Sequence, residues 1–278
     1  IESLLFNRLC KFILNNTELI QNNAIVINYL DLITSFSFLA RKSNYVKPLI
    51  TEERMLDIKK ARHPVIERLM PSTEKFIPNN LLMDANNNQI HLLTGPNMAG
   101  KSTYLRQIGL IVILAQIGSF VPAEKAKIGI VDRLFTRVGA SDNLAAGEST
   151  FLVEMNEVAN ILNNASNKSL ILLDEVGRGT ATYDGLSLAW AITEYIHNNV
   201  NIQARTIFAT HYHELTELEK SLGKIENYHV EVKEFKDSII FLRSIAKGAG
   251  DKSYGIQVAK MAGLPNSVIL RATNILNQ

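Results

Sequence analysis

The chain has 278 residues, enough for one large domain or two ordinary ones. Hydrophobic residues make up 46% of it and charged residues 20%, which is an ordinary globular balance. The net charge of +2, with a sequence pI near 8.5, is too small to indicate nucleic-acid binding through the overall field alone.

Two features bear on membranes and on the cellular compartment. The longest uninterrupted apolar run, at residues 108–115, is far shorter than the roughly 20 residues of a membrane span, and no charged-then-apolar leader is present. The single cysteine, Cys10, cannot form an internal disulfide, which agrees with a reducing compartment. We therefore expect a cytoplasmic protein with no membrane partner. Because the first residue is Ile1, we also expect a fragment or a processed chain.

Residues 1–43 have the pattern of helices. Their apolar side chains recur at steps of three and four, at Ile1, Leu4, Leu5, Leu9, Phe12 and Ile13. Asparagine-rich text at 15–16 and 21–23 predicts an interruption before a second apolar run at 24–40. Two such helices cannot enclose a core, so we expect residues 1–44 to be the end of a larger helical domain.

The rest of the chain predicts an α/β fold. Proline-rich text at 45–88 favours short edge strands and loops. Apolar strands at 90–94, 170–173 and 206–210 alternate with helices at 102–118 and from near Asp184, which implies a buried parallel sheet with helices on its faces. A hairpin (229–233 with 239–243) and two helices (254–262 and 266–277) follow.

The segment from Gly95 to Ser102, GPNMAGKS, fits the pattern G-x-x-x-x-G-K-[ST]. Its glycines let the backbone curl so that several N–H groups converge on phosphate oxygens, and the helix that follows adds its partial positive charge. Lys101 can reach the β- and γ-phosphates, and Ser102 can offer its hydroxyl to Mg²⁺. The alternative is a glycine-rich turn beside a surface lysine. The segment lies between an apolar strand and an amphipathic helix, which favours a nucleoside triphosphate site.

Two acids, Asp174 and Glu175, end the strand at 170–173. In a parallel sheet this places them at the carboxyl edge, where ligands of α/β proteins sit. Asp174 can hold Mg²⁺ through water, and Glu175 can orient or deprotonate the attacking water. The alternative is that the acids only cap the next helix.

His211 follows the strand at 206–210, where it could donate to a γ-phosphate. A single histidine is more often structural. Metal binding by the two histidines of the run His211-Tyr-His213-Glu214 is a second alternative. However, no third ligand stands out, and Glu217 replaces the second histidine of H-E-x-x-H.

The small hydroxylic segment around Ser149 and Thr150 precedes a helix and is a second potential phosphate site. The first loop already supplies one site, so the natural target of this segment is the nucleotide of another subunit. The alternative is ordinary helix capping by either hydroxyl.

Several strings occur in the order expected of one family: GPNMAGKSTYLRQ, FTRVGASDNL, ESTFLVEMNEVANIL, LLDEVGRGTATYDGLSLAWA, FATHYHEL and KSYGIQVAKMAGLP. Together they resemble the C-terminal part of the MutS family of DNA mismatch-repair proteins, of bacterial type, over essentially the whole chain. The resemblance implies a P-loop NTPase of ABC-ATPase type, with a sheet flanked by helices. It divides the chain into the end of a helical core or lever domain (1–44), an ATPase domain (45–247) and a dimerising helix–turn–helix (248–278).

The resemblance also implies roles for single residues. The nucleotide would be bound by the loop residues Gly95, Pro96, Asn97, Met98, Ala99, Gly100, Lys101, Ser102 and Thr103. Phe76 and Ile77 match the segment that packs on the adenine. Lys101, Glu175 and the switch histidine His211 would be catalytic, with Mg²⁺ held by Ser102 and Asp174. Ser149 would act in trans on the partner's γ-phosphate, and the run 177–180 matches the loop that signals between the two sites.

For the whole protein the resemblance implies ATP and ADP with Mg²⁺ as ligands, a homodimer through the ATPase domains, mismatched double-stranded DNA and a MutL-type repair partner. The mismatch-reading domain and the clamps fall outside this chain, so we expect it to bind and hydrolyse ATP weakly without discriminating mismatches. Glu148 departs from the family pattern. We expect its carboxylate to point away from the phosphate, towards the helix N-terminus.

Three alternatives remain. A transporter or chromosome-maintenance ATPase should carry LSGGQ before the acidic strand, where this chain has GESTFLVEM at 147–155. A nucleotide-gated dimerisation module would bind ATP with only incidental turnover. A recombination-suppressing branch of the same family is nearer, although the spelling GPNMAGKST favours the repair branch.

Overall fold

The computed structural model describes residues 1–278 apart from 72, 98, 140–148, 236–237, 251–253 and 277–278. The chain forms two compact units, Ile1–Tyr45 and Val46–Gln278. The first contains helices only, and the second contains every described strand.

The first unit consists of α1 (Glu2–Asn15) and α2 (Thr17–Lys42). The chain turns at Asn16, whose side-chain amide donates to the carbonyl of Phe12 at 2.8 Å. The predicted interruption at 21–23 is wrong, because α2 continues through it. The segment contains neither glycine nor proline, and asparagine lowers helix propensity by only a fraction of a kcal/mol.

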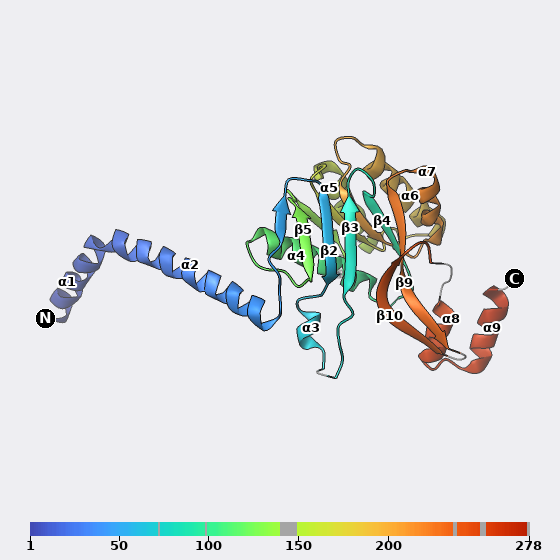
Figure 1. Ribbon diagram of the computed structural model, residues 1–278, viewed down its shortest axis with the longest axis horizontal. Coiled ribbons are helices and arrows are strands. Elements are labelled where there is room, and N and C mark those ends of the chain that lie inside the picture. The colour runs from blue at the N-terminus through green and yellow to red at the C-terminus, as the bar shows by residue number, and fades with distance from the viewer. Residues whose placement is uncertain (72, 98, 140–148, 236–237, 251–253, 277–278) are drawn as a thin grey trace. The chain divides into compact units, whose positions relative to one another are not determined.

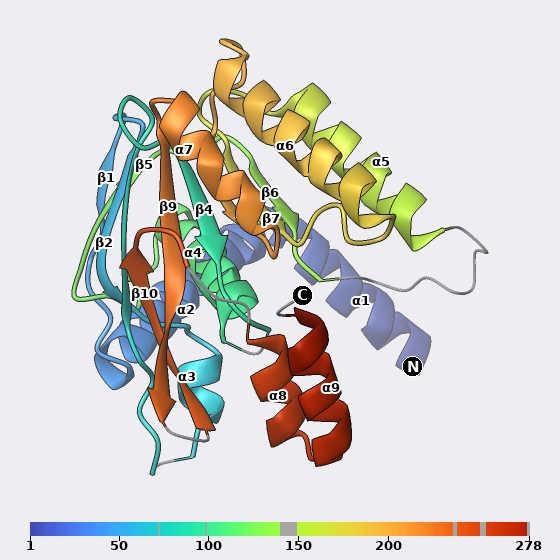
Figure 2. The same ribbon diagram turned by 90° about the vertical axis from the view of Figure 1, so that its right-hand side faces the viewer.

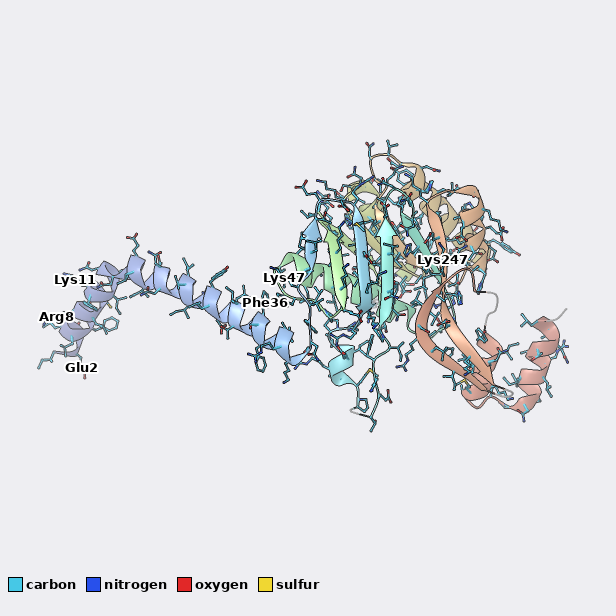
Figure 3. The ribbon with its side chains drawn as sticks, in the orientation of Figure 1. Glu2, Arg8, Lys11, Phe36, Lys47 and Lys247 are labelled. Carbon is cyan, nitrogen blue, oxygen red and sulfur yellow. The ribbon has the colours of Figure 1, made fainter. Side chains whose placement is uncertain are left out.

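The helices of this unit bury almost nothing. Ala40 is the one buried residue among the described positions of α1 and α2, and Figure 3 shows side chains projecting on all sides of both. By length and composition α2 could cross a membrane, but the core helix of a soluble protein passes the same test. The expectation that these helices enclose no core by themselves is confirmed.

The second unit is built on a six-stranded sheet in the order β10-β9-β4-β8-β7-β6. All its neighbours are parallel except β9 and β10, which form an antiparallel hairpin at one edge. The strands are β4 (Ile90–Thr94), β6 (Leu134–Arg137), β7 (Leu170–Asp174), β8 (Arg205–Ala209), β9 (Ile225–Phe235) and β10 (Ser238–Lys247). The predicted buried parallel sheet is confirmed.

A second, four-stranded sheet has the order β1-β5-β2-β3. Its strands are β1 (Leu49–Thr51), β2 (Met55–Ala61), β3 (Asn79–Asp84) and β5 (Lys125–Gly129). The prolines of this region lie outside the strands, and β1 and β3 are edge strands as expected. The central position of β2 was not expected. It depends on pairing with β5, which is remote in sequence.

The helices cover both faces of the larger sheet. In Figure 2, α5 and α6 lie side by side. The longer helices of the unit are α4 (Lys101–Gln116), α5 (Thr150–Asn164) and α6 (Thr182–Asn198). The shorter ones are α3 (Ile66–Leu69), the 3₁₀ turn η2 (His213–Glu217), α7 (Leu218–Ser221), α8 (Gly255–Met261) and α9 (Asn266–Leu276).

Alternation along the central strands divides the core into two layers. Leu170 and Leu172 of β7 face a cluster that includes α4 and the small sheet, whereas Ile171 and Leu173 face the cluster beneath α5 and α6. Helix α4 is therefore packed between the two sheets (Figure 1). All of β7 is buried, as expected of a parallel strand covered on both faces.

The C-terminal hairpin is longer than predicted. Its first strand starts at Ile225 because this segment also pairs in parallel with β4, through Ile90 with Ile225 and on to Thr94 with His229. The alternation that defines a strand is interrupted between Phe241 and Ile245, where the register shifts. Long-range pairing has extended the strand beyond its local pattern.

Candidate nucleotide site

The glycine loop joins β4 to α4 at the carboxyl edge of the larger sheet. Gly95 has φ +142° and Gly100 has φ +104°, conformations that L side chains rarely adopt. Gly100 lies directly before α4, so the free N–H groups of the first helical turn open at the loop. This is the backbone arrangement that an anion site requires. Met98 lies outside the described residues.

The Lys101 side chain is turned back over the loop. Its Nζ donates to the carbonyl oxygens of Gly95 at 2.7 Å and Pro96 at 3.1 Å, and it lies 3.2 Å from His211 Nε2. Burial lowers the pKa of Lys101 to about 8, although the charges of Glu175 and Asp174 act in the opposite direction. The ammonium group is thus desolvated and held by neutral acceptors. A negatively charged phosphate oxygen would stabilise its charge more strongly than these carbonyl oxygens do.

Ser102 and Asp174 lie together at the end of β7. Burial raises the pKa of Asp174, while a hydrogen bond from the Ser102 hydroxyl lowers it. Asp174 Oδ1 is buried without a hydrogen-bond partner among the described residues. An unpaired buried carboxylate oxygen beside a hydroxyl is a donor set that suits Mg²⁺, which prefers oxygen ligands and retains water. These residues therefore fit the predicted metal.

Glu175 is the centre of a charged cluster. Its Oε1 lies 2.6 Å from His211 Nε2, and its Oε2 forms an ion pair with Arg178. The contact with His211 is the main reason that the pKa of Glu175 falls to about 2, and Arg178 contributes further. Glu175 also has φ +58°, which is unusual for a residue other than glycine. The carboxylate is ionised, and its contacts with Arg178 and His211 orient it.

The second histidine of the segment, His213, contacts a different part of the chain from Glu175 and Lys101. Its Nδ1 lies 3.1 Å from the carbonyl oxygen of Gly250. In the described part of the chain, no group of three or more His, Cys, Asp or Glu side chains is arranged to hold a metal ion. A cavity of about 390 Å³ opens here, lined by Gly95, Pro96, Asn97, His211, His213, Tyr254, Gly255 and Val258. Asn97 and His211 therefore face the same space.

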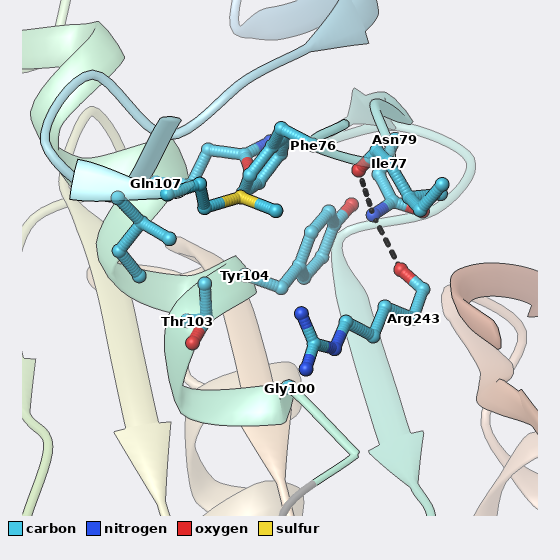
Figure 4. A pocket seen from close by; sticks show the side chains of 10 residues that line it. Phe76, Ile77, Asn79, Gly100, Thr103, Tyr104, Gln107 and Arg243 are labelled. Carbon is cyan, nitrogen blue, oxygen red and sulfur yellow. Dashed lines mark hydrogen bonds between the residues drawn. The ribbon is translucent and has the colours of Figure 1, made fainter. Parts of the chain in front are cut away.

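A second cavity, of about 260 Å³, lies beside Gly100 and Thr103 (Figure 4). It is lined by Ile66, Met70, Phe76, Ile77, Asn79, Gly100, Thr103, Tyr104, Gln107 and Arg243. Asn79 donates to the carbonyl oxygen of Arg243 at 2.9 Å and so ties the start of β3 to β10. The predicted pair Phe76 and Ile77 is thus brought beside Gly100 and Thr103 although it lies well before them in the chain.

Ser149 lies just before α5 and is exposed. It makes no side-chain capping hydrogen bond within the described structure, so capping does not occupy its hydroxyl. Ser149 is not among the described residues that line either cavity, and its action on a partner's nucleotide stays a prediction. Glu148, whose orientation we predicted, lies outside the described residues.

The structure brings together most of the predicted residues and adds others. Lys101, the consecutive pair Asp174 and Glu175, and His211 come from three different segments and converge on one edge. Sequence reasoning did not single out Arg243 as a lining residue or Arg178 as a partner of Glu175. Arg178 follows Glu175 after two intervening residues, and this spacing alone does not reveal that the two form an ion pair. Arg243 reaches the cavity only because the hairpin of β9 and β10 returns to β3.

Comparison with known proteins gives consistent matches. Residues 91–278 match the family model described as MutS domain V. The chain is 56% identical over 278 residues to DNA mismatch repair protein MutS of Bacteroides thetaiotaomicron, covering 100% of this chain and 32% of that protein. It is 55% identical over 276 residues to the Salinibacter ruber protein of the same name, covering 99% of this chain and 30% of the relative. The chain thus spans about a third of the length of the curated relatives it matches.

Proposed function

The chain belongs to the MutS family of DNA mismatch repair proteins, and we propose that it is the part that binds and hydrolyses Mg-ATP. The observation that carries this proposal is the convergence at the carboxyl edge of the sheet. Lys101 Nζ is 3.2 Å from His211 Nε2, which is 2.6 Å from Glu175 Oε1, all beside a glycine loop at a helix N-terminus. Few functions other than phosphoryl transfer use this set of groups.

The phosphates of the nucleotide would lie in the loop and on the first turn of α4. Lys101 would exchange the carbonyls of Gly95 and Pro96 for β- and γ-phosphate oxygens, which gives charge-assisted bonds in place of neutral ones. Ser102 and Asp174 would hold Mg²⁺, which neutralises charge on the phosphates when bound. The cavity lined by Phe76, Ile77 and Arg243 has the size and the apolar lining for the adenine base.

Glu175 would act on the water that attacks the γ-phosphate. Its low pKa keeps it ionised at neutral pH, so its contribution is to orient the water and to accept a hydrogen bond from it. His211 lies against Glu175 and Lys101, where it would donate to the γ-phosphate. Without nucleotide, Arg178 and His211 together occupy Glu175, so the carboxylate must be released before it can hold water.

The site would be completed by a second subunit. The hydroxyl of Ser149 at the N-terminus of α5, which makes no capping bond within the described structure, suits the γ-phosphate of the partner. The helix–turn–helix at 248–278 suits a homodimer contact, because α8, α9 and the turn between them carry the exposed apolar residues Met261, Leu264, Val268, Leu270, Ile275 and Leu276. The fold proposed for the second unit is accordingly the ABC type of P-loop ATPase, with 45–247 as the ATPase domain proper.

The remaining proposals concern the longer protein. Its relatives are named as DNA mismatch repair proteins and are about three times as long as this chain. Residues 1–44 would be the end of a helical domain that covers the exposed apolar surface of α1 and α2. The whole protein would bind mismatched double-stranded DNA and a MutL-type partner and would act in the cytoplasm at the nucleoid.

Two variants test the proposal. Lys101→Ala should abolish measurable Mg-ATP binding by calorimetry. Glu175→Gln should retain binding within about threefold and lose turnover by at least about 100-fold, the usual contribution of an acid–base group. Equal turnover in Glu175→Gln and the unaltered protein would show that the carboxylate is misassigned. Undiminished binding by Lys101→Ala would refute the nucleotide site itself.

A further inference from the structure

Helix α5 carries a buried carboxylate that the proposed reaction does not use. Glu154 is only 6% exposed. Its Oε1 accepts a hydrogen bond from the backbone N–H of Gly177 at 2.5 Å, and its Oε2 lies 3.6 Å from Arg137. A carboxylate buried on a helix is costly unless it is paired. Both oxygens of Glu154 have partners, and one of these partners is the loop that follows Glu175.

Gly177 is held on its other side as well. Its carbonyl oxygen accepts a hydrogen bond from the Tyr212 hydroxyl at 3.0 Å, and Tyr212 is the neighbour of His211. Gly177 has φ +93°, and a Cβ placed there would lie 2.5 Å from the carbonyl oxygen of Gly185 on α6. Both polar groups of its backbone are therefore fixed by side chains, in a space that admits no other residue.

We propose that Glu154 and Tyr212 are positioning residues for ATP hydrolysis. By holding Gly177 from two sides, they fix the loop that begins at Glu175 and connect it to the segment carrying His211. This inference rests on the proposed function, since the orientation of Glu175 matters only if Glu175 serves hydrolysis. The φ of +58° at Glu175 supports it, because such a backbone conformation persists only where the surroundings hold it.

The same contact links this loop to the subunit interface proposed above. Glu154 lies one helical turn after Thr150, at the end of α5 that Ser149 precedes. A Cβ at Gly179 would lie 3.1 Å from Cβ of Phe151, so the loop also packs closely on the first turn of α5. A displacement of this end of α5 by the partner's nucleotide would therefore be transmitted to Glu175 through Gly177.

The test compares four variants of the chain. Glu154→Ala removes the acceptor, Glu154→Gln keeps an acceptor oxygen at the same reach, and Tyr212→Phe removes only the hydroxyl. Glu157→Gln is the matched control, because Glu157 lies on the same helix and pairs with Arg137 at 2.9 Å without contacting Gly177. Turnover, KM, Mg-ATP affinity and amide hydrogen exchange of residues 176–180 are measured for each.

We expect Glu154→Ala to lower kcat by at least about tenfold, because small displacements of reacting groups are costly, while ATP affinity changes by less than about twofold. Tyr212→Phe should lower kcat by about fivefold, because the free energy of one typical hydrogen bond corresponds to about this change in rate. Glu154→Gln should recover most of the activity, and Glu157→Gln should match the unaltered chain. Amide hydrogen exchange at 176–180 should accelerate in Glu154→Ala and Tyr212→Phe only.

Other outcomes are equally decisive. If exchange and kcat are unchanged in both Glu154→Ala and Tyr212→Phe, the inference is wrong. If Glu154→Ala does not fold, Tyr212→Phe and Glu154→Gln decide the question. If ATP binds but the unaltered chain shows no turnover, the proposed hydrolysis fails, and the exchange of 176–180 still shows whether Glu154 and Tyr212 hold the loop.

Discussion

The protonation of Lys101 should couple nucleotide binding to pH. Burial holds its pKa near 8 in the empty protein, and bound phosphate oxygens would raise it. ATP binding at about pH 8.5 should therefore take up protons, and affinity should fall as pH rises through about 8. Calorimetry in two buffers of different ionisation enthalpy measures this uptake. Binding by the unaltered protein without proton uptake at about pH 8.5 would contradict the assignment.

The same shift predicts the pH dependence of stability. Since the pKa of Lys101 is lower in the folded protein than in the unfolded chain, the unfolded chain binds more protons between about pH 8 and the ordinary lysine value. The free energy of unfolding of the nucleotide-free protein should thus rise with pH in this window. Urea titrations across it should show the rise in the unaltered protein and its absence in Lys101→Met.

Gly100 should be required for its backbone conformation alone. Its φ is +104°, and a Cβ built there meets no neighbouring atom of the described residues within 4 Å, so alanine would add strain without a clash among them. Gly100→Ala should lower the free energy of unfolding by about 1–2 kcal/mol, measured by urea unfolding. Gly223→Ala is the matched control, because Gly223 has equally open space and no left-handed φ. Equal effects of the two substitutions would contradict this account.

Single residues differed in how far the sequence could predict them. Lys101 was predictable because it belongs to the glycine-loop motif after an apolar strand. Asp174 was predictable because it directly ends another apolar strand. Glu154 was not, because an acid in an amphipathic helix normally lies on the solvated face, and its burial depends on an N–H group from another segment. The burial of Glu154 and the positive φ of Glu175 are departures from local expectation at the candidate site, where function often requires an irregular structure.

At the scale of elements, Arg205 connects the two sheets. It lies at the start of β8, fully buried, and its guanidinium donates to the carbonyl oxygens of Met55, Gly129, Ile130 and Lys168. Arg205→Ala would leave several buried carbonyls unpaired and should lower the free energy of unfolding by at least about 3 kcal/mol. Exposed Arg133, which donates to the carbonyl oxygen of Asn164, is the control, with an expected loss below about 1 kcal/mol.

Predicted elements were most accurate where packing is local. The strands at 90–94 and 170–173 and the helix after the glycine loop were predicted within a residue or two, since apolar runs and glycine signals mark them directly. The four-stranded sheet was not predicted, because pairing β2 with β5 joins segments on either side of α4. Such pairings depend on tertiary contacts that no local pattern carries.

For the whole molecule, a shared active site predicts that activity depends on protein concentration. Turnover per subunit should rise with concentration if Ser149 acts on the partner's nucleotide, and it should be constant if each chain suffices. Ile275 on α9 is 55% exposed, and Ile275→Asp would place a charge in the proposed apolar contact. This variant should shift the rise to at least about tenfold higher concentration, since burying an unpaired charge is costly.

The control and the contradicting results for this prediction are equally specific. Asn274→Asp adds the same charge at the adjacent exposed position of α9 and should leave the concentration dependence almost unchanged. In sedimentation experiments with Mg-ATP, the fraction of dimer should rise over the same protein concentrations as the turnover per subunit. A fully active monomer would refute the shared site while leaving the phosphate loop intact, because Lys101, Asp174 and Glu175 all belong to one chain. Dimerisation without any rise in turnover would instead favour a nucleotide-gated module over an enzyme.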